Sequence, residues 1–174
     1  PVTGTPTGFR DLDARGILRP ANLTVIAADS SQGKTSLAIS ICMNAAKYGT
    51  KIAFYTMEMT PEELATRMLS KESGIGGRAI VSSPLTRDEL VQIDRSIQKV
   101  INLSIYFDGR STSSIDTIIS SIRMMKKRYD IDGAVIDYLQ ILNINNGKDA
   151  GNDEQRMGIA ARRLKNIAKD LKIW

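Results

Sequence analysis

Residues 23–36 have the sequence LTVIAADSSQGKTS, in which an apolar, partly β-branched run gives way to a polar loop. The run at 23–28 predicts a short strand, and residues 29–33 predict the loop that ends it. From Thr35 onward, apolar residues recur around most of a helix that ends near Gly49, where glycine can adopt the left-handed cap. This order of strand, Gly-Lys-Thr-Ser loop and helix predicts a phosphate-binding site.

The residue types of this loop suit nucleotide chemistry. Backbone N–H groups at a helix N-terminus converge on phosphate oxygens, the Lys34 ammonium neutralises phosphate charge, and the Thr35 hydroxyl is a ligand for Mg²⁺. The full pattern G-x-x-x-x-G-K-[ST] is incomplete, because its first glycine position is Ala28. The predicted nucleotide-binding residues are Ser30, Ser31, Gln32, Gly33, Lys34, Thr35 and Ser36.

Strand and helix patterns alternate along the rest of the chain. Further strands are predicted at 51–56, 103–107 and 133–136, and residues 74–87 are predicted to be irregular. Helices are predicted from Thr60, where Glu63 completes a capping box, and at 89–100, 115–128 and 157–171. The alternation predicts an α/β fold, a mostly parallel sheet flanked by helices, with ligands at the carboxyl ends of its strands.

Composition excludes several classes of site and location. The chain of 174 residues has no histidine and one cysteine, Cys42, so it cannot by itself build a zinc site, a disulfide or a Ser-His-Asp triad. No apolar run reaches the ~20 residues of a membrane-spanning helix. We therefore expect a cytoplasmic protein without a membrane partner. The net charge of +5 permits a polyanionic partner without proving one.

Two acidic residues follow predicted strands. Asp137 ends the strand at 133–136 and could hold a hydrated magnesium ion beside the phosphate loop, although aspartates also often cap helices or turns at such positions. Glu58 follows the strand at 51–56, between two methionines, and could activate water. The alternative for Glu58 is a surface glutamate stabilised by a helix N-terminus, and the local sequence does not choose between the two.

Four ordered segments stand out together: TGTPTGFRDLD at 3–13, VIAADSSQGKT at 25–35, MEM at 57–59 and VIDYLQ at 135–140. In this order they resemble the RecA-like motor domain of replicative DnaB-type DNA helicases. The resemblance runs over nearly the whole chain, and in that family an alanine at position 28 is ordinary. Proline is common in the family where this chain has Ser30, and methionine where it has Gln32, but neither change removes a backbone donor.

The resemblance implies a RecA-like P-loop NTPase that hydrolyses Mg-ATP between the subunits of a homo-hexamer. Such a ring translocates on single-stranded DNA, unwinds duplex, and has primase and a helicase loader as partners. Carried over by position, Lys34 and Thr35 are the Walker A phosphate and metal residues, and Asp137 is the Walker B aspartate. Glu58 becomes the catalytic glutamate that activates water. Lys34 is expected to be catalytic as well, in addition to binding phosphate. Gln140 is a further nucleotide-binding candidate at the site edge.

The resemblance also sets the expected domain organisation. Residues 1–174 are expected to form a single RecA-like ATPase domain, incomplete at its C-terminal end, as a fragment of a larger helicase. The family's sensor strand, second DNA loop and arginine finger would lie after Trp174. An arginine finger supplied in trans contributes ~10³-fold or more to the rate of related NTPases. The isolated chain is therefore expected to bind nucleotide but hydrolyse it slowly.

The DNA contact is predicted from the polar stretch at 143–153. The family places a channel-facing loop there, and Lys148, with Arg156 just beyond, could contact the phosphate backbone of DNA. The alternative is an ordinary disordered surface loop. Two other functions also stay open: a RecA-like or KaiC-like ATPase, and a nucleotide-gated interaction module that hydrolyses little.

Overall fold

The computed structural model describes residues 4–57, 59–108, 114–137 and 153–174. Its sheet has strands β1 (Ile52–Thr56), β2 (Ile105–Phe107) and β3 (Gly133–Asp137), in the order β2-β1-β3. Both pairings are parallel, with Ile52 opposite Ile105 on one side and opposite Gly133 on the other. All three carboxyl ends therefore meet at one edge of the sheet, and the predicted α/β class is confirmed.

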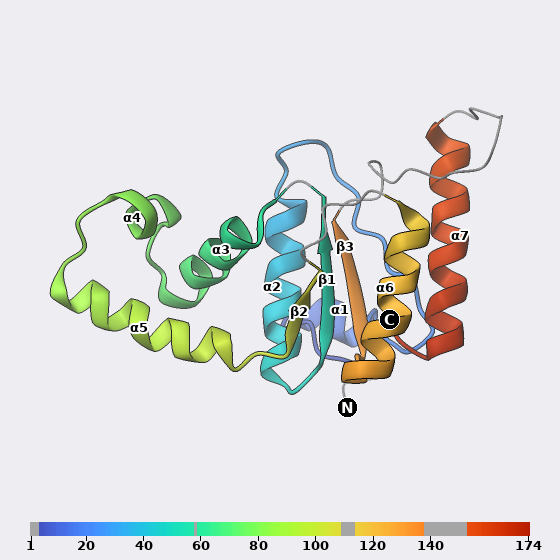
Figure 1. Ribbon diagram of the computed structural model, residues 1–174, viewed down its shortest axis with the longest axis horizontal. Coiled ribbons are helices and arrows are strands. Elements are labelled where there is room, and N and C mark those ends of the chain that lie inside the picture. The colour runs from blue at the N-terminus through green and yellow to red at the C-terminus, as the bar shows by residue number, and fades with distance from the viewer. Residues whose placement is uncertain (1–3, 58, 109–113, 138–152) are drawn as a thin grey trace.

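Helices cover both faces of the sheet (Figure 1). Because side chains alternate along a strand, Phe54 packs against α2 (Lys34–Lys47), while Ala53 and Tyr55 face α6 (Ile115–Tyr129) and α7 (Asp153–Leu171). The first core contains Ile39, Ile41, Met43, Phe54, Leu64 and Met68, and the second contains Ile115, Ile118, Ile122, Ala160, Leu164 and Ile167. No helix in the described ranges is long and apolar enough to cross a membrane.

Three helices form an arm beside α2: α3 (Pro61–Ser73), α4 (Gly77–Ser82) and α5 (Arg87–Ile101). The capping box predicted at Thr60 and Glu63 is present, and Thr86 with Glu89 forms a second one at the start of α5. Helix α4 lies where the sequence predicted an irregular connection, so that prediction is wrong. A helix of six residues is held by its packing on α3 more than by propensity, which the local sequence does not reveal.

An ion-pair cluster fixes the arm to α2. The half-buried Glu72 places its carboxylate 2.7 Å from Lys47 Nζ of α2 and 3.6 Å from Lys99 Nζ of α5. The hydrogen bond from Lys47 lowers the pKa of Glu72 below its ordinary value, and the charges of both lysines act in the same direction. Because the pKa of Glu72 is lower in the folded state, its ionised carboxylate stabilises the fold at pH values above its unfolded-state pKa. This contribution is lost as the pH falls through the folded-state pKa of Glu72.

We predict that Glu72→Gln lowers the free energy of unfolding by about 1 kcal/mol at neutral pH, a small value because both lysines are partly solvent-exposed. Thermal denaturation of wild type and variant should show a Tm gap that narrows from about pH 6 to about pH 3. The exposed Glu62→Gln on the same helix is the matched control. A gap of constant size across this pH range would contradict the prediction.

The described part of the N-terminal motif, residues 4–13, makes structural contacts with α2. Buried Thr7 donates its N–H and its hydroxyl to Asp13 Oδ1 at 2.6 and 2.7 Å, and these bonds lower the pKa of Asp13. Asn44 of α2 donates to the Thr7 carbonyl at 3.0 Å. The short helix α1 (Arg10–Arg15) is thereby tied to the side of α2. Within the described residues, these bonds hold the start of the domain rather than the phosphate loop.

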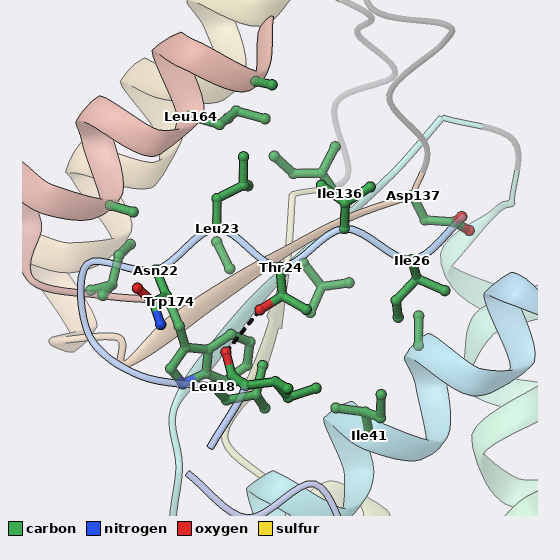
Figure 2. A pocket seen from close by; sticks show the side chains of 18 of the residues that line it. Leu18, Asn22, Leu23, Thr24, Ile26, Ile41, Ile136, Asp137, Leu164 and Trp174 are labelled. Carbon is green, nitrogen blue, oxygen red and sulfur yellow. Dashed lines mark hydrogen bonds between the residues drawn. The ribbon is translucent and has the colours of Figure 1, made fainter. Parts of the chain in front are cut away.

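The strand predicted at 23–28 is wrong. Residues 22–29 have no regular secondary structure. In the described part of the chain, the backbone of 23–28 makes no hydrogen bond to another backbone group, and a strand requires such a partner. The segment instead runs alongside β3 with a cavity between them (Figure 2). The apolar side chains of Leu23, Val25 and Ile26 are 37%, 66% and 39% exposed.

Trp174 closes the amino end of that cavity. Its N–H donates to the Asp132 carbonyl at 3.1 Å, its carbonyl accepts from the Ala134 N–H at 2.8 Å, and its indole Nε1 donates to Thr5 Oγ1 at 3.1 Å. The indole ring lies against the Cα of Gly133, where a Cβ atom would overlap it. Glycine is therefore required at this position by the close approach of the ring.

We predict that Gly133→Ala destabilises the fold by about 2 kcal/mol, because a well-packed site must expel the indole or shift the strand. Fluorescence of Trp174, the only tryptophan, should shift to longer wavelength as the ring gains solvent. Gly158→Ala in α7 is the matched control: open space surrounds its Cα, and alanine should stabilise the helix by roughly 0.5–1 kcal/mol. Unchanged stability and emission in Gly133→Ala would show that the ring adapts freely.

Candidate nucleotide site

The predicted phosphate loop turns sharply into α2. Ser31 has φ of 63° and Gly33 has φ of 87°, so two of the loop residues adopt left-handed backbone. Gly33 is the N-cap of α2, and no side chain caps the first N–H groups of this helix. The loop is also exposed at Ser30, Gln32 and Ser36. Exposed N–H groups and the positive end of the helix dipole together form a site suited to phosphate.

Residues far apart in sequence meet beside this loop. The Thr35 hydroxyl, in the first turn of α2, donates to Asp137 Oδ2 at 3.0 Å across 102 positions of sequence. Asp137 ends β3 and is 8% exposed. The sequence predicted both residues as metal ligands, and the structure brings their oxygen atoms together.

This oxygen pair fits a magnesium ion. Mg²⁺ prefers oxygen ligands, retains several waters, and is bound through one or two carboxylates plus substrate phosphates. The described residues contain no cluster of three or more acidic, histidine or cysteine side chains that could hold a metal alone. An ion here would therefore depend on Thr35, Asp137, water and the phosphates of a nucleotide.

Lys34 lines the same cavity as Asp137. It is half-buried, and it lines one cavity together with Ala28 at the end of the 22–28 segment and Asp137 at the end of β3. A lysine that begins a helix directly after a phosphate loop presents its ammonium group to the phosphates. The geometry thus assembles the loop, Lys34, Thr35 and Asp137 at the carboxyl edge of the sheet.

The end of β1 is held against the end of β3. The Met57 N–H donates to the Asp137 carbonyl at 3.1 Å, and the Met59 N–H donates to Thr56 Oγ1 at 3.2 Å. Glu58 itself lies outside the described residues, as do Gln140 and Lys148. The neighbours of Glu58 on both sides nevertheless belong to the same sheet edge as Asp137.

Arg156 is exposed in the first turn of α7. This turn lies at the same end of the molecule as the carboxyl ends of the strands (Figure 1). Arg156 is therefore at the end of the molecule where the phosphate loop opens.

One acidic residue at this edge was missed by the sequence reasoning. Asp108 directly follows β2, and its Oδ2 accepts a hydrogen bond from Ser121 Oγ of α6 at 2.6 Å. Ser121 in turn accepts from the buried Tyr55 hydroxyl at 3.0 Å. The signal was present, since an aspartate after an apolar strand is the same pattern that identified Asp137. These bonds place the Asp108 carboxylate toward α6, on the face of the sheet opposite α2.

Comparison with known proteins shows the family of this chain. The family model described as "DnaB-like helicase C terminal domain" matches residues 4–174. The chain belongs to the DnaB-like helicase C-terminal domain family. It is 31% identical over 170 residues to a probable plasmid replicative DNA helicase of Chlamydia trachomatis, covering 97% of this chain and 37% of that protein. It is also 31% identical over 175 residues to the replicative DNA helicase DnaB of Geobacillus stearothermophilus, covering 99% of this chain and 38% of the relative.

Solved structures give the same fold for this DnaB-like domain. A DnaB-like replicative helicase, solved in a study of its interactions with primase, superposes with a TM-score of 0.86 at 24% identity, covering 99% of this chain and 42% of that chain. A second solved structure, described as an ATPase domain, superposes with a TM-score of 0.88 at 24% identity, covering 99% of this chain and 62% of that chain. The chain thus spans less than two-fifths of the curated relatives described above.

Proposed function

We propose that this domain is the ATP-driven motor of a replicative DNA helicase. The observation that carries the proposal is the hydrogen bond between Thr35 and Asp137, which unites the phosphate loop with the end of β3. In P-loop NTPases a threonine or serine of this loop and an aspartate after a buried strand together hold the magnesium ion of the nucleotide. Membership of the DnaB-like family supports a helicase over a RecA-like or KaiC-like ATPase.

Each residue of the site has a proposed role. Ser30, Ser31, Gln32, Gly33 and Ser36 line the phosphates with the loop backbone, and Lys34 neutralises the phosphate charge that develops during hydrolysis. Thr35 and Asp137 hold Mg²⁺, which when bound neutralises phosphate charge. Glu58 orients or deprotonates the attacking water, and Gln140 contacts nucleotide at the site edge. Family membership and the geometry around Thr35 support these assignments.

The proposed partners follow from the relatives. Replicative helicases act on DNA, so we propose single-stranded DNA as the track, with Lys148 and Arg156 contacting its phosphates, and a homo-hexamer as the assembly. A DnaB-like neighbour was solved in a study of its interactions with primase, which makes primase a proposed partner, with a helicase loader as another. We further propose that residues 1–174 are part of a larger cytoplasmic helicase, in agreement with the greater length of the relatives.

The test is phosphate release from Mg-ATP by the larger helicase proposed to contain residues 1–174, because the arginine finger and the second DNA loop are expected to lie outside these residues, and it is run with and without a single-stranded DNA oligonucleotide. A motor is expected to show slow basal turnover that rises severalfold with DNA, because the track favours the hydrolysing arrangement of subunits. Duplex DNA of the same sequence is the control. Nucleotide binding with turnover that single-stranded DNA leaves unchanged would overturn the motor and indicate a nucleotide-gated interaction module.

A further inference from the structure

The side chains at the end of β1 alternate between the two faces of the sheet. Phe54 packs with the core of α2, and Tyr55 packs with the core of α6 and α7. The next residue, Thr56, therefore faces α2. Thr56 is also the register partner of Asp137 in the parallel pairing of β1 with β3. The two side chains are thus neighbours at the carboxyl edge if Asp137 faces α2 as well.

Two observations place Asp137 on the face of α2. Its Oδ2 accepts the hydrogen bond from Thr35, which lies in the first turn of that helix. Val135, two residues earlier in β3, packs with the core of α2. Three side chains with oxygen atoms therefore meet at one corner of the sheet edge, and each comes from a different element: Thr35 from α2, Thr56 from β1 and Asp137 from β3.

The acidic residue that follows β2 is directed away from this corner. Asp108 Oδ2 accepts from Ser121 Oγ at 2.6 Å, and Ser121 belongs to α6 on the other face of the sheet. The Tyr55 hydroxyl donates to the same serine at 3.0 Å. Thr56, and not Asp108, is the strand-end side chain that accompanies Thr35 and Asp137.

The Thr56 hydroxyl is oriented by the turn that follows β1. Its Oγ1 accepts from the Met59 N–H at 3.2 Å. A threonine hydroxyl has one proton and two lone pairs, so this bond uses one lone pair. Among the residues that the structure describes, the proton and the second lone pair of Thr56 have no partner. Thr56 is half-buried, so its hydroxyl is held at the edge and is still able to bond to water.

We propose that the Thr56 hydroxyl holds a water of the magnesium hydration shell, beside Thr35 and Asp137. The inference rests on the proposed function, which assigns Mg²⁺ to that pair. Mg²⁺ gives up water reluctantly and keeps several waters when a protein binds it, so groups around it mainly contact its waters. A hydroxyl with a free proton and a free lone pair suits this contact. Thr56 is then a positioning residue that acts through a metal-bound water.

The test measures nucleotide binding by the larger helicase proposed to contain residues 1–174. Thr56→Val and Thr56→Ala remove the hydroxyl, and Thr56→Ser keeps it. The Kd of a fluorescent ADP analogue is measured in excess EDTA and then at rising Mg²⁺ concentrations, which gives the Mg²⁺ concentration for half of the full effect. Tyr55→Phe is the matched control, because it removes a hydroxyl bond from the adjacent residue of β1 on the opposite face.

We expect Thr56→Val and Thr56→Ala to require about tenfold more Mg²⁺ than the wild type, the usual effect of losing a group that supports a metal ligand. Their Kd in EDTA should be unchanged, which shows that the fold and the phosphate loop are intact. Thr56→Ser and Tyr55→Phe should require as much Mg²⁺ as the wild type does.

Three results would overturn the role of Thr56 and leave the proposed function standing. The first is a wild-type Mg²⁺ requirement in both hydroxyl deletions. The second is an equal shift in Tyr55→Phe, because loosening of β1 would then explain the effect. The third is binding weakened equally in EDTA and in Mg²⁺, which would limit Thr56 to its bond with Met59. If Mg²⁺ leaves the Kd of the wild type unchanged, the proposed metal site fails, and the role of Thr56 fails with it.

Discussion

Lys34→Ala is expected to weaken Mg-ATP binding by roughly 10- to 150-fold, which corresponds to the loss of about 1.5–3 kcal/mol of charge-assisted hydrogen bonding. The reason is the position of Lys34 at the start of α2, directly after the exposed loop and on one cavity with Asp137. No other residue of the described loop carries a positive charge. The alanine variant leaves the backbone donors in place, so residual binding measures their contribution.

The measurement is titration of the chain with a fluorescent Mg-ATP analogue. Lys127→Ala is the matched control, because this lysine is equally a helix residue but is exposed in the last turn of α6. It should bind nucleotide as the wild type does, which separates a local effect from a change in net charge. A Kd for Lys34→Ala within twofold of wild type would show that the phosphates bind elsewhere, and the proposed site would fail.

Local signals were sufficient where one segment of sequence determines its own structure. The Gly-Lys-Thr-Ser segment predicted the start of α2, and Thr60 with Glu63 predicted a capping box that the structure contains. The alternation of apolar strands and amphipathic helices predicted the parallel sheet. In each case the deciding interactions lie within a few residues of one another, or repeat with the period of the element.

Signals failed where the structure of a segment depends on a distant partner. Residues 23–28 have the composition of a strand, yet a strand also needs a hydrogen-bonded neighbour on its edge, and a cavity separates this segment from β3. Helix α4 was missed for a related reason, because its packing on α3 is not visible in its own six residues.

The same distinction between local signals and distant contacts applies to the candidate site. Thr35 and Asp137 were predicted from local motifs, but their hydrogen bond joins positions 102 residues apart and could be established only from the fold. The motif at 3–13 was noticed through resemblance alone, and its contacts with Asn44 show a structural role that its sequence did not indicate. Asp108 was missed although it follows a strand as Asp137 does, because no family motif marks its position.

Glu58→Gln is expected to reduce ATP turnover by on the order of 10²- to 10⁴-fold, the usual contribution of a positioned general base, while nucleotide binding stays near the wild-type value. Glutamine has the size of glutamate but cannot accept the proton of the attacking water. The bonds that flank position 58, from Met57 to Asp137 and from Met59 to Thr56, tie this segment to the edge where Mg-ATP is proposed to bind. A change at position 58 should therefore act on the reaction rather than on the fold.

Turnover is measured as phosphate release with single-stranded DNA present, and binding as in the Lys34→Ala titration. Glu62→Gln removes an exposed carboxylate in the first turn of α3 and should leave turnover unchanged. Loss of turnover with retained binding in Glu58→Gln separates the chemical step from nucleotide capture, since Lys34→Ala loses both. Turnover that persists in Glu58→Gln would assign Glu58 the alternative role of a surface glutamate stabilised by the helix N-terminus, and the search for the base would move to the carboxylates at the ends of β2 and β3.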